Sequence, residues 1–126
     1  MPLIDTEPYS RKIIGCAIEV HKVLGPGLLE SIYEAALCRE LTIAGLTFNR
    51  QQTLPVYYKG RPLDCEFRMD LVVENTLVVE IKAVQALLPL HEAQLLTYLK
   101  VSGLPAGLLL NFNESRLTEG IRRRLL

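Results

Sequence analysis

The stretch from Glu66 to Val84, EFRMDLVVENTLVVEIKAV, most constrains what this chain can fold into. Two runs of alternating apolar residues flank a turn signal at residues 74–76, which is typical of a β-hairpin. Side chains alternate between the two faces of a strand, so we expect one apolar set to face a core. That set is Phe67, Met69, Leu71, Val73, Leu77, Val79, Ile81 and Ala83. The opposite set mixes charges with valines: Glu66, Arg68, Asp70, Val72, Val78, Glu80, Lys82 and Val84.

The register of this hairpin decides which charges meet. A three-residue loop predicts these pairs: Val73 with Leu77, Leu71 with Val79, Asp70 with Glu80, Met69 with Ile81, and Arg68 with Lys82. Like charges directly opposite each other are destabilising, so Asp70 and Glu80 require a compensating cation. Lys82 is one candidate and a divalent metal ion is another, since hard cations bind clustered carboxylates. An ordinary alternative is a solvated face of an antiparallel sheet, where such charges need no special role.

Composition limits the class of protein. The 126 residues suit one domain, and the 49% hydrophobic and 22% charged content is typical of a globular chain. The first ten residues do not resemble a signal peptide, and no apolar run approaches the ~20 residues of a membrane helix. We therefore expect a cytoplasmic protein whose Cys16, Cys38 and Cys65 are reduced and buried. The formal net charge of zero argues against binding nucleic acid by bulk charge, although arginines cluster near the C-terminus at Arg116, Arg122, Arg123 and Arg124.

The remaining chain predicts an α/β fold. Helices are expected at residues 5–24, capped by Thr6, at 28–44 and at 89–102, where apolar residues recur at helical spacing. Residues 47–58 look extended, with Pro55 suggesting an edge strand, and 106–112 is typical of a buried strand. The tail 120–126 fits a short basic strand or a helical turn. The crossover helix before 106–112 predicts a parallel contact and hence a mixed sheet.

Two helices carry polar residues of interest. In 28–44, Ile32, Ala36 and Leu41 are expected to face the core, while Glu30, Tyr33 and Glu34 form a polar stripe. Glu30 also lies in the first turn, where the helix dipole alone would favour an anion. In 89–102, Gln94 and Tyr98 lie one turn apart, either as a functional pair or as surface residues beside a leucine stripe. His21 near the end of the first helix is expected to be partly buried and bonded to a carbonyl.

Several blocks of the sequence resemble a known family. Residues 27–33, GLLESIY, match G-x-x-E-x-x-Y, and they are joined in order by LPVYYKG, VVEIKAV, HEAQLLTYLK and GLLLNF. Together these blocks are similar to the bacterial and archaeal GxxExxY proteins, which are grouped with the PD-(D/E)XK nuclease superfamily. The resemblance runs from about Tyr9 to the end. It implies a single domain over residues 1–126 with a restriction-endonuclease-like core, a mixed central sheet flanked by helices, and a metal site on the central hairpin.

The resemblance also implies roles for individual residues. Asp70 resembles the first acid of the superfamily, although Met69 stands where proline is common, and Glu80-Ile81-Lys82 resembles its E-x-K. Glu30 resembles an acid from the first core helix, which makes Asp70, Glu80 and Glu30 the expected metal ligands and, with Lys82, the catalytic residues. Gln94 and Tyr98 resemble a Q-x-x-x-Y pair, and we count them with Tyr33 as substrate-binding residues.

The implied activity is Mg²⁺-dependent hydrolysis of phosphodiester bonds in DNA, with Mn²⁺ as a substitute ion and either endo- or exonucleolytic action. Two alternatives stay open at this point. One is a catalytically weak nucleic-acid-binding or regulatory module, and the other is a metal-dependent hydrolase of a small phosphate ester. The expected partners are nucleic acid and a second copy of the chain, because a small core often needs a second subunit to surround a duplex. No membrane partner is expected.

Overall fold

The computed structural model describes residues 8–126. The elements are α1 (Ser10–Leu24), α2 (Glu30–Ile43), β1 (Phe48–Tyr58), β2 (Arg61–Val73), β3 (Leu77–Lys82), α3 (Pro89–Ser102), β4 (Ala106–Asn111), the 3-10 helix η2 (Leu117–Gly120) and β5 (Ile121–Leu125). The predicted order is confirmed, and the tail contains both a helical turn and a short strand. The predicted start of the first helix at residue 5 and its cap Thr6 lie outside the described residues.

Within residues 8–126, five strands form one mixed sheet in the order β1-β2-β3-β4-β5. All neighbours are antiparallel except β3 and β4, which run parallel because α3 crosses over between them. β1 is an edge strand, and its register shifts between Pro55 and Tyr57, as expected for a proline that lacks an N–H donor. The predicted α/β architecture is therefore confirmed.

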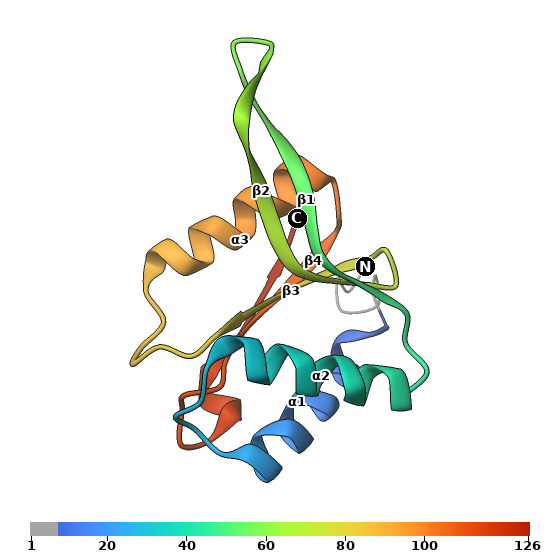
Figure 1. Cartoon of the computed structure of the whole chain (residues 1–126), viewed down its shortest axis with the longest axis vertical. Helices are drawn as coiled ribbons and strands as arrows, with labels where there is room; N and C mark the ends of the chain where they lie inside the picture. The colour runs from blue at the N-terminus through green and yellow to red at the C-terminus, as the bar shows by residue number, and fades with distance from the viewer. Residues whose placement is uncertain (1–7) are drawn as a thin grey trace.

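Two hydrophobic clusters cover opposite faces of the sheet. α1 and α2 pack with residues such as Leu71, Val79 and Leu108 on one face, and α3 packs with Val78 and Leu109 on the other. Helix α3 lies so close to β4 that a Cβ atom added to Gly107 would come within 2.7 Å of the Leu95 side chain. Figure 1 shows this layered body, with β1 and β2 continuing beyond it as a long ribbon.

The β2–β3 hairpin confirms the predicted loop but not the predicted faces. Its paired residues are Val73–Leu77, Val72–Val78 and Leu71–Val79, so the loop has the expected parity. Met69, however, packs with Val72 in the α3 cluster, whereas Leu71 packs in the α1–α2 cluster. Strict alternation is thus interrupted at Asp70, and the prediction that Met69 and Ile81 share a buried face is wrong. Both side chains are buried, but on opposite sides of the sheet.

Beyond this interruption β2 pairs with β1 alone. Arg68 lies opposite Thr53 of β1, and the ladder with β3 does not extend to it. The predicted pairing of Arg68 with Lys82 is therefore wrong. The cause is that β2 pairs with β3 only from Leu71 onward, so the part of β2 that precedes Leu71 forms one side of a two-stranded ribbon with β1.

Helix α2 is rotated relative to the prediction. Its buried residues are Tyr33, Glu34, Leu37, Cys38 and Leu41, while Ile32 and Leu29 are exposed. The expected polar stripe therefore lies mostly inside, and of the expected core positions only Leu41 is fully buried. Apolar residues occur on more than one side of this helix, so their spacing does not define a single face.

Three smaller expectations have clear outcomes. The His21 side chain is buried near the end of α1, and its Nε2 lies 2.7 Å from the carbonyl oxygen of Glu114, as expected. Cys16 and Cys38 are buried free thiols, but Cys65 is exposed on the ribbon, so the expectation of burial is wrong there. In the part of the chain described, no helix has the length and apolar character to cross a membrane.

Candidate metal and active site

Asp70 and Glu80 interlock where β2 and β3 separate. The backbone N–H of Asp70 donates to Glu80 Oε2 at 2.8 Å, and the backbone N–H of Ile81 donates to Asp70 Oδ2 at 2.8 Å. Each carboxylate thus accepts from the opposite strand just beyond the last ladder pair, Leu71–Val79. The two residues are cross-strand neighbours as predicted, and they replace ladder hydrogen bonds with side-chain ones.

Burial makes this carboxylate pair electrostatically unusual. The Glu80 side chain is only 4% exposed, and its burial, followed by the charge of Asp70, raises its pKa to about 8. Burial also raises the pKa of Asp70, with a further rise from Glu34, while the Ile81 N–H and the Lys82 charge oppose that rise. Two buried carboxylates at this spacing disfavour double ionisation unless a cation joins them.

Lys82 supplies one positive charge beside the pair. It follows Glu80 by two residues at the end of β3, is half-buried, and lowers the pKa of both carboxyl groups. The predicted cation is therefore in place, yet the Glu80 pKa stays raised. A single ammonium compensates only part of the repulsion.

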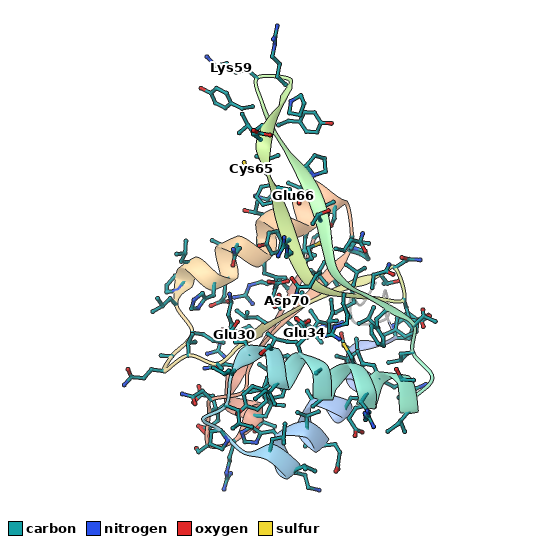
Figure 2. All side chains as sticks on the ribbon, viewed as in Figure 1. Glu30, Glu34, Lys59, Cys65, Glu66 and Asp70 are labelled. Atoms are coloured by element: carbon teal, nitrogen blue, oxygen red, sulfur yellow. The ribbon has the colours of Figure 1, made fainter. Side chains whose placement is uncertain are left out.

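Helix α2 brings a third acid, Glu34, toward the pair. Its Oε2 accepts from Arg50 Nε at 3.2 Å and Nη2 at 3.1 Å, and its Oε1 accepts from Gln51 Nε2 at 2.8 Å. The same Gln51 amide nitrogen lies 3.4 Å from Asp70 Oδ1, so it links the two acids. Gln51 has a positive φ of 53°, which is uncommon for a residue other than glycine. Figure 2 shows Glu30, Glu34 and Asp70 gathered between α2 and the base of the ribbon.

Glu30 reaches the sheet at a different point. Its Oε2 accepts from the backbone N–H of Ala83 at 3.3 Å, one residue after Lys82, and its side chain is exposed. It borders an open hollow of about 430 Å³ with Leu28, Leu29, Ser31 and Ala83. Glu30 therefore lies at the end of β3, as a neighbour of Lys82, and makes no hydrogen bond to Asp70 or Glu80 in residues 8–126.

Helix α3 brings Tyr98 to the site but leaves Gln94 at the surface. Tyr98 is buried, its ring meets Phe67 edge to face at 5.7 Å, and its pKa is raised by burial and by the charges of Glu80 and Asp70. Gln94 is exposed one turn earlier and forms no hydrogen bond with the described part of the chain. Of the two α3 residues expected to approach Asp70 and Glu80, Tyr98 is the one that does so.

Tyr33 has a structural role. Its side chain is fully buried and stacks on Phe112 with ring centroids 4.7 Å apart. Its hydroxyl donates to the Gly25 carbonyl at 2.5 Å and accepts from the Leu28 N–H at 3.1 Å. These bonds hold the loop between α1 and α2, so the placement of Tyr33 among substrate-binding residues is corrected: no substrate can reach it in this conformation.

The arginines near the C-terminus do not form an open basic strip. Arg124 forms an ion pair with Glu92 of α3, and the Arg122 side chain donates to the carbonyl oxygens of Glu119 and Ile121. Arg122, Arg123 and Arg124 are all partly buried. The Arg124 charge thus links β5 to α3, and the Arg122 side chain is engaged by nearby carbonyl groups.

The roles of three residues at this site do not follow from the sequence pattern. Gln51 drew no notice because its partners lie in distant elements. The sequence predicts Glu34 in a polar stripe with Glu30 and Tyr33, and this spacing does not reveal that Glu34 is buried beside Arg50 and Gln51. Buried Asn111 also went unnoticed. It bonds Val84 through both its amide oxygen and nitrogen, which fixes the chain just after Lys82.

The donor set fits a hard divalent cation. Asp70 and Glu80 provide carboxylate oxygens with raised pKa values, and Mg²⁺ characteristically takes few protein ligands and keeps several waters. Among residues 8–126, no group of three or more His, Cys, Asp or Glu side chains is placed to hold an ion. The expected three-carboxylate set with Glu30 is therefore not assembled, and the two-carboxylate pair is what fits.

Comparison with known proteins gives one match. The family model of the PD-(D/E)XK nuclease superfamily matches residues 7–124. Searches of curated proteins and of solved structures found no match. The matched region includes the interlocked carboxylates, Lys82 and all the described helices and strands except the last residue of β5.

Proposed function

The chain belongs to the PD-(D/E)XK nuclease superfamily, and on that premise we propose that it hydrolyses phosphodiester bonds in DNA with Mg²⁺ as its cofactor. The observation that carries this proposal is the Asp70–Glu80 pair, interlocked by two 2.8 Å hydrogen bonds and adjoined by Lys82. Perturbed pKa values in such a cluster are typical of a functional site.

Asp70 and Glu80 would hold the ion, each with one oxygen tied to a backbone N–H, while the second oxygen of Asp70 lies 3.4 Å from the Gln51 amide nitrogen. When bound, Mg²⁺ polarises a phosphoryl oxygen and makes a water molecule a stronger nucleophile. The two backbone hydrogen bonds fix the orientation of both carboxylates before any ion arrives, which reduces reorganisation during the reaction.

Lys82 is proposed to stabilise the negative charge that develops on the phosphate and to orient the attacking water. It already interacts electrostatically with both carboxyl groups, so it lies in the same local field as the reacting atoms would. Glu30 is proposed as a positioning residue, because its bond to the Ala83 N–H steadies the chain next to Lys82. Tyr98 and the exposed Gln94 are proposed to border the bound phosphate from α3.

The test is cleavage of supercoiled plasmid by the wild type, Asp70→Asn and Lys82→Ala, each with EDTA, Mg²⁺ and Mn²⁺. We expect metal-dependent nicking by the wild type and a loss of at least about 10³-fold in each variant. Glu66→Gln is the matched control, since it removes an exposed carboxylate from the same strand and should retain activity.

The alternatives give different outcomes in the same assay. Retention of DNA in a binding assay without any nicking would indicate a binding module. Hydrolysis of a mononucleotide or another small phosphate ester, without plasmid nicking, would indicate a small-substrate hydrolase. Full activity of Asp70→Asn would contradict the assignment of the metal site.

A further inference from the structure

Within residues 8–126, the outer halves of β1 and β2 form an arm whose side chains are almost all exposed. We call residues 55–66 the arm and its outermost residues 57–61 the arm tip. Tyr58 pairs with Arg61 across a two-residue turn, Lys59-Gly60, in which both residues have positive φ. This is the backbone pattern of the tight hairpin turns whose twist matches the strands, so the arm ends in a defined turn. Figure 1 shows the arm extending well beyond the body.

The arm tip carries an unusual set of exposed side chains. Tyr57 and Tyr58 are 62% and 61% exposed, and Lys59 Nζ lies 5.5 Å from the centre of the Tyr58 ring. Lys59 and Arg61 are its two cations, and no Asp or Glu occurs in residues 55–63. Because the whole chain has zero formal net charge, this positive end is a local feature.

We propose that the arm tip binds the DNA duplex beside the bond that is cleaved, and so holds the substrate against the site. Lys59 and Arg61 would contact phosphates, and the tyrosines would pack on sugar or base edges. A two-stranded β-ribbon is of a width that the major groove of B-DNA admits. This inference rests on the proposed nuclease function and adds to it a second contact with the substrate.

The covalent continuity of β2 fixes how far that contact lies from the chemistry. Arg61 at the arm tip and Asp70 at the site belong to one strand and are nine positions apart. At ~3.3 Å per residue this is about 30 Å, which equals the rise of about nine base pairs. Figure 2 shows this path along the strand, with Lys59 at the tip, Cys65 and Glu66 along the arm and Asp70 at its base. Duplexes that end within about nine base pairs of the cleaved bond should therefore not reach the arm tip.

The experiment compares Lys59→Ala/Arg61→Ala with the wild type on duplexes that extend about 5, 10 and 20 base pairs on both sides of a cleaved step. Binding is measured with Ca²⁺ in place of Mg²⁺, and cleavage with Mg²⁺. Each lost phosphate contact costs about eightfold in affinity at 0.1 M salt, so we expect about ten- to sixtyfold weaker binding to the longer duplexes. The slope of log affinity against log salt should fall by about 1–2, while the shortest duplex should be bound and cleaved as by the wild type.

The matched control is Arg11→Ala/Lys22→Ala, which removes two exposed cations from α1 on the body. It should leave the dependence on duplex length unchanged. The inference would be overturned if both double variants had equal effects, or if the arm variant behaved as the wild type at every duplex length. In either case, cleavage by the wild type would still support the proposed function. Absence of DNA binding and cleavage by the wild type would refute both. A wild-type dimer that becomes monomeric in the arm variant, with duplex affinity unchanged, would show that the arm tip binds a second copy and would also overturn the inference.

Discussion

Strand β2 takes part in two hairpins that differ in almost every respect. The outer hairpin, with β1, has a two-residue turn and exposed side chains over most of its length. The inner hairpin, with β3, has a three-residue loop and is buried on both faces. In the inner hairpin burial specifies the register, because a slip would move apolar side chains out of two cores. In the outer part of the β1–β2 hairpin, residues 55–66, side chains are mostly exposed, so the turn is the main feature that specifies the register there.

The boundary between these hairpins is the candidate site. At Asp70 the strand leaves β3, and Met69 and Leu71 face opposite cores although they are two residues apart. Asp70 and Glu80 fill the gap with side-chain hydrogen bonds. The difference teaches that a site of buried charges can be built where a strand changes partners, since backbone N–H groups are available there to orient carboxylates.

The largest contrast should be in stability. Met69→Ala removes a fully buried side chain and should lower the free energy of unfolding by about 2–5 kcal/mol, whereas Leu63→Ala on the arm should change it by less than about 0.5 kcal/mol. Urea unfolding followed by circular dichroism measures both. Similar losses in the two variants would mean that the arm is as tightly packed as the body.

A somewhat smaller effect should appear with pH. Glu80 has a pKa of about 8 in the folded protein, above the ordinary value of 4.5, so the folded state binds an extra proton between these values. The metal-free protein should therefore be most stable near pH 4.5, and its free energy of unfolding should fall by on the order of a few kcal/mol as the pH rises to about 8. Asp70 contributes in the same direction, and Lys82 opposes it. Thermal melts in EDTA test this, and Glu80→Gln should flatten the profile. A wild-type profile that rises over this range would contradict the raised pKa.

Asp70→Asn should abolish metal binding without destabilising the fold. The amide oxygen can still accept from the Ile81 N–H, and the substitution removes the Asp70 charge that opposes ionisation of Glu80. In EDTA the variant should be as stable as the wild type or more stable by up to roughly 1 kcal/mol, the scale of a cross-strand pair. The rise in melting temperature that Mn²⁺ gives the wild type should vanish. A destabilised variant, together with a wild type that Mn²⁺ does not stabilise, would make Asp70 a structural residue.

The smallest effect concerns the turn of the arm. Lys59 has φ of 51°, a region that asparagine tolerates better than lysine, and Asn-Gly is favoured in such turns. Lys59→Asn should therefore stabilise the protein by a few tenths of a kcal/mol, about 0.5 at most. The free energy of unfolding is measured in urea for Lys59→Asn and for Lys100→Asn, which changes an exposed lysine outside the arm. A loss of stability would show that the lysine side chain itself supports the turn.

The parts predicted correctly from the sequence are those set by local pattern. The loop parity of residues 74–76 followed from the apolar residues on both sides, and the crossover predicted the parallel contact of β3 with β4. The neighbouring positions of Asp70 and Glu80 followed from the same parity.

The parts not predicted depend on distant partners. The face of Met69 changes because side chains replace the ladder at Asp70 and Gln51 adopts a positive φ, neither of which alternation can reveal. Glu34 is buried because Arg50 and Gln51, 16 and 17 positions away, meet its carboxylate. Tyr33 is buried because Phe112 and the Gly25 carbonyl receive it. In each case a long-range contact outweighs the local pattern.

An uncovered ribbon also presents two open backbone edges, which are the usual starting points of edge-to-edge aggregation. In the described structure the arm section of β2 pairs only with β1, so both strands expose such an edge. Charged side chains line the outer part of β2: Arg61, Asp64, Glu66 and Arg68. These charges make the β2 edge of the arm a poorer template for pairing with another chain.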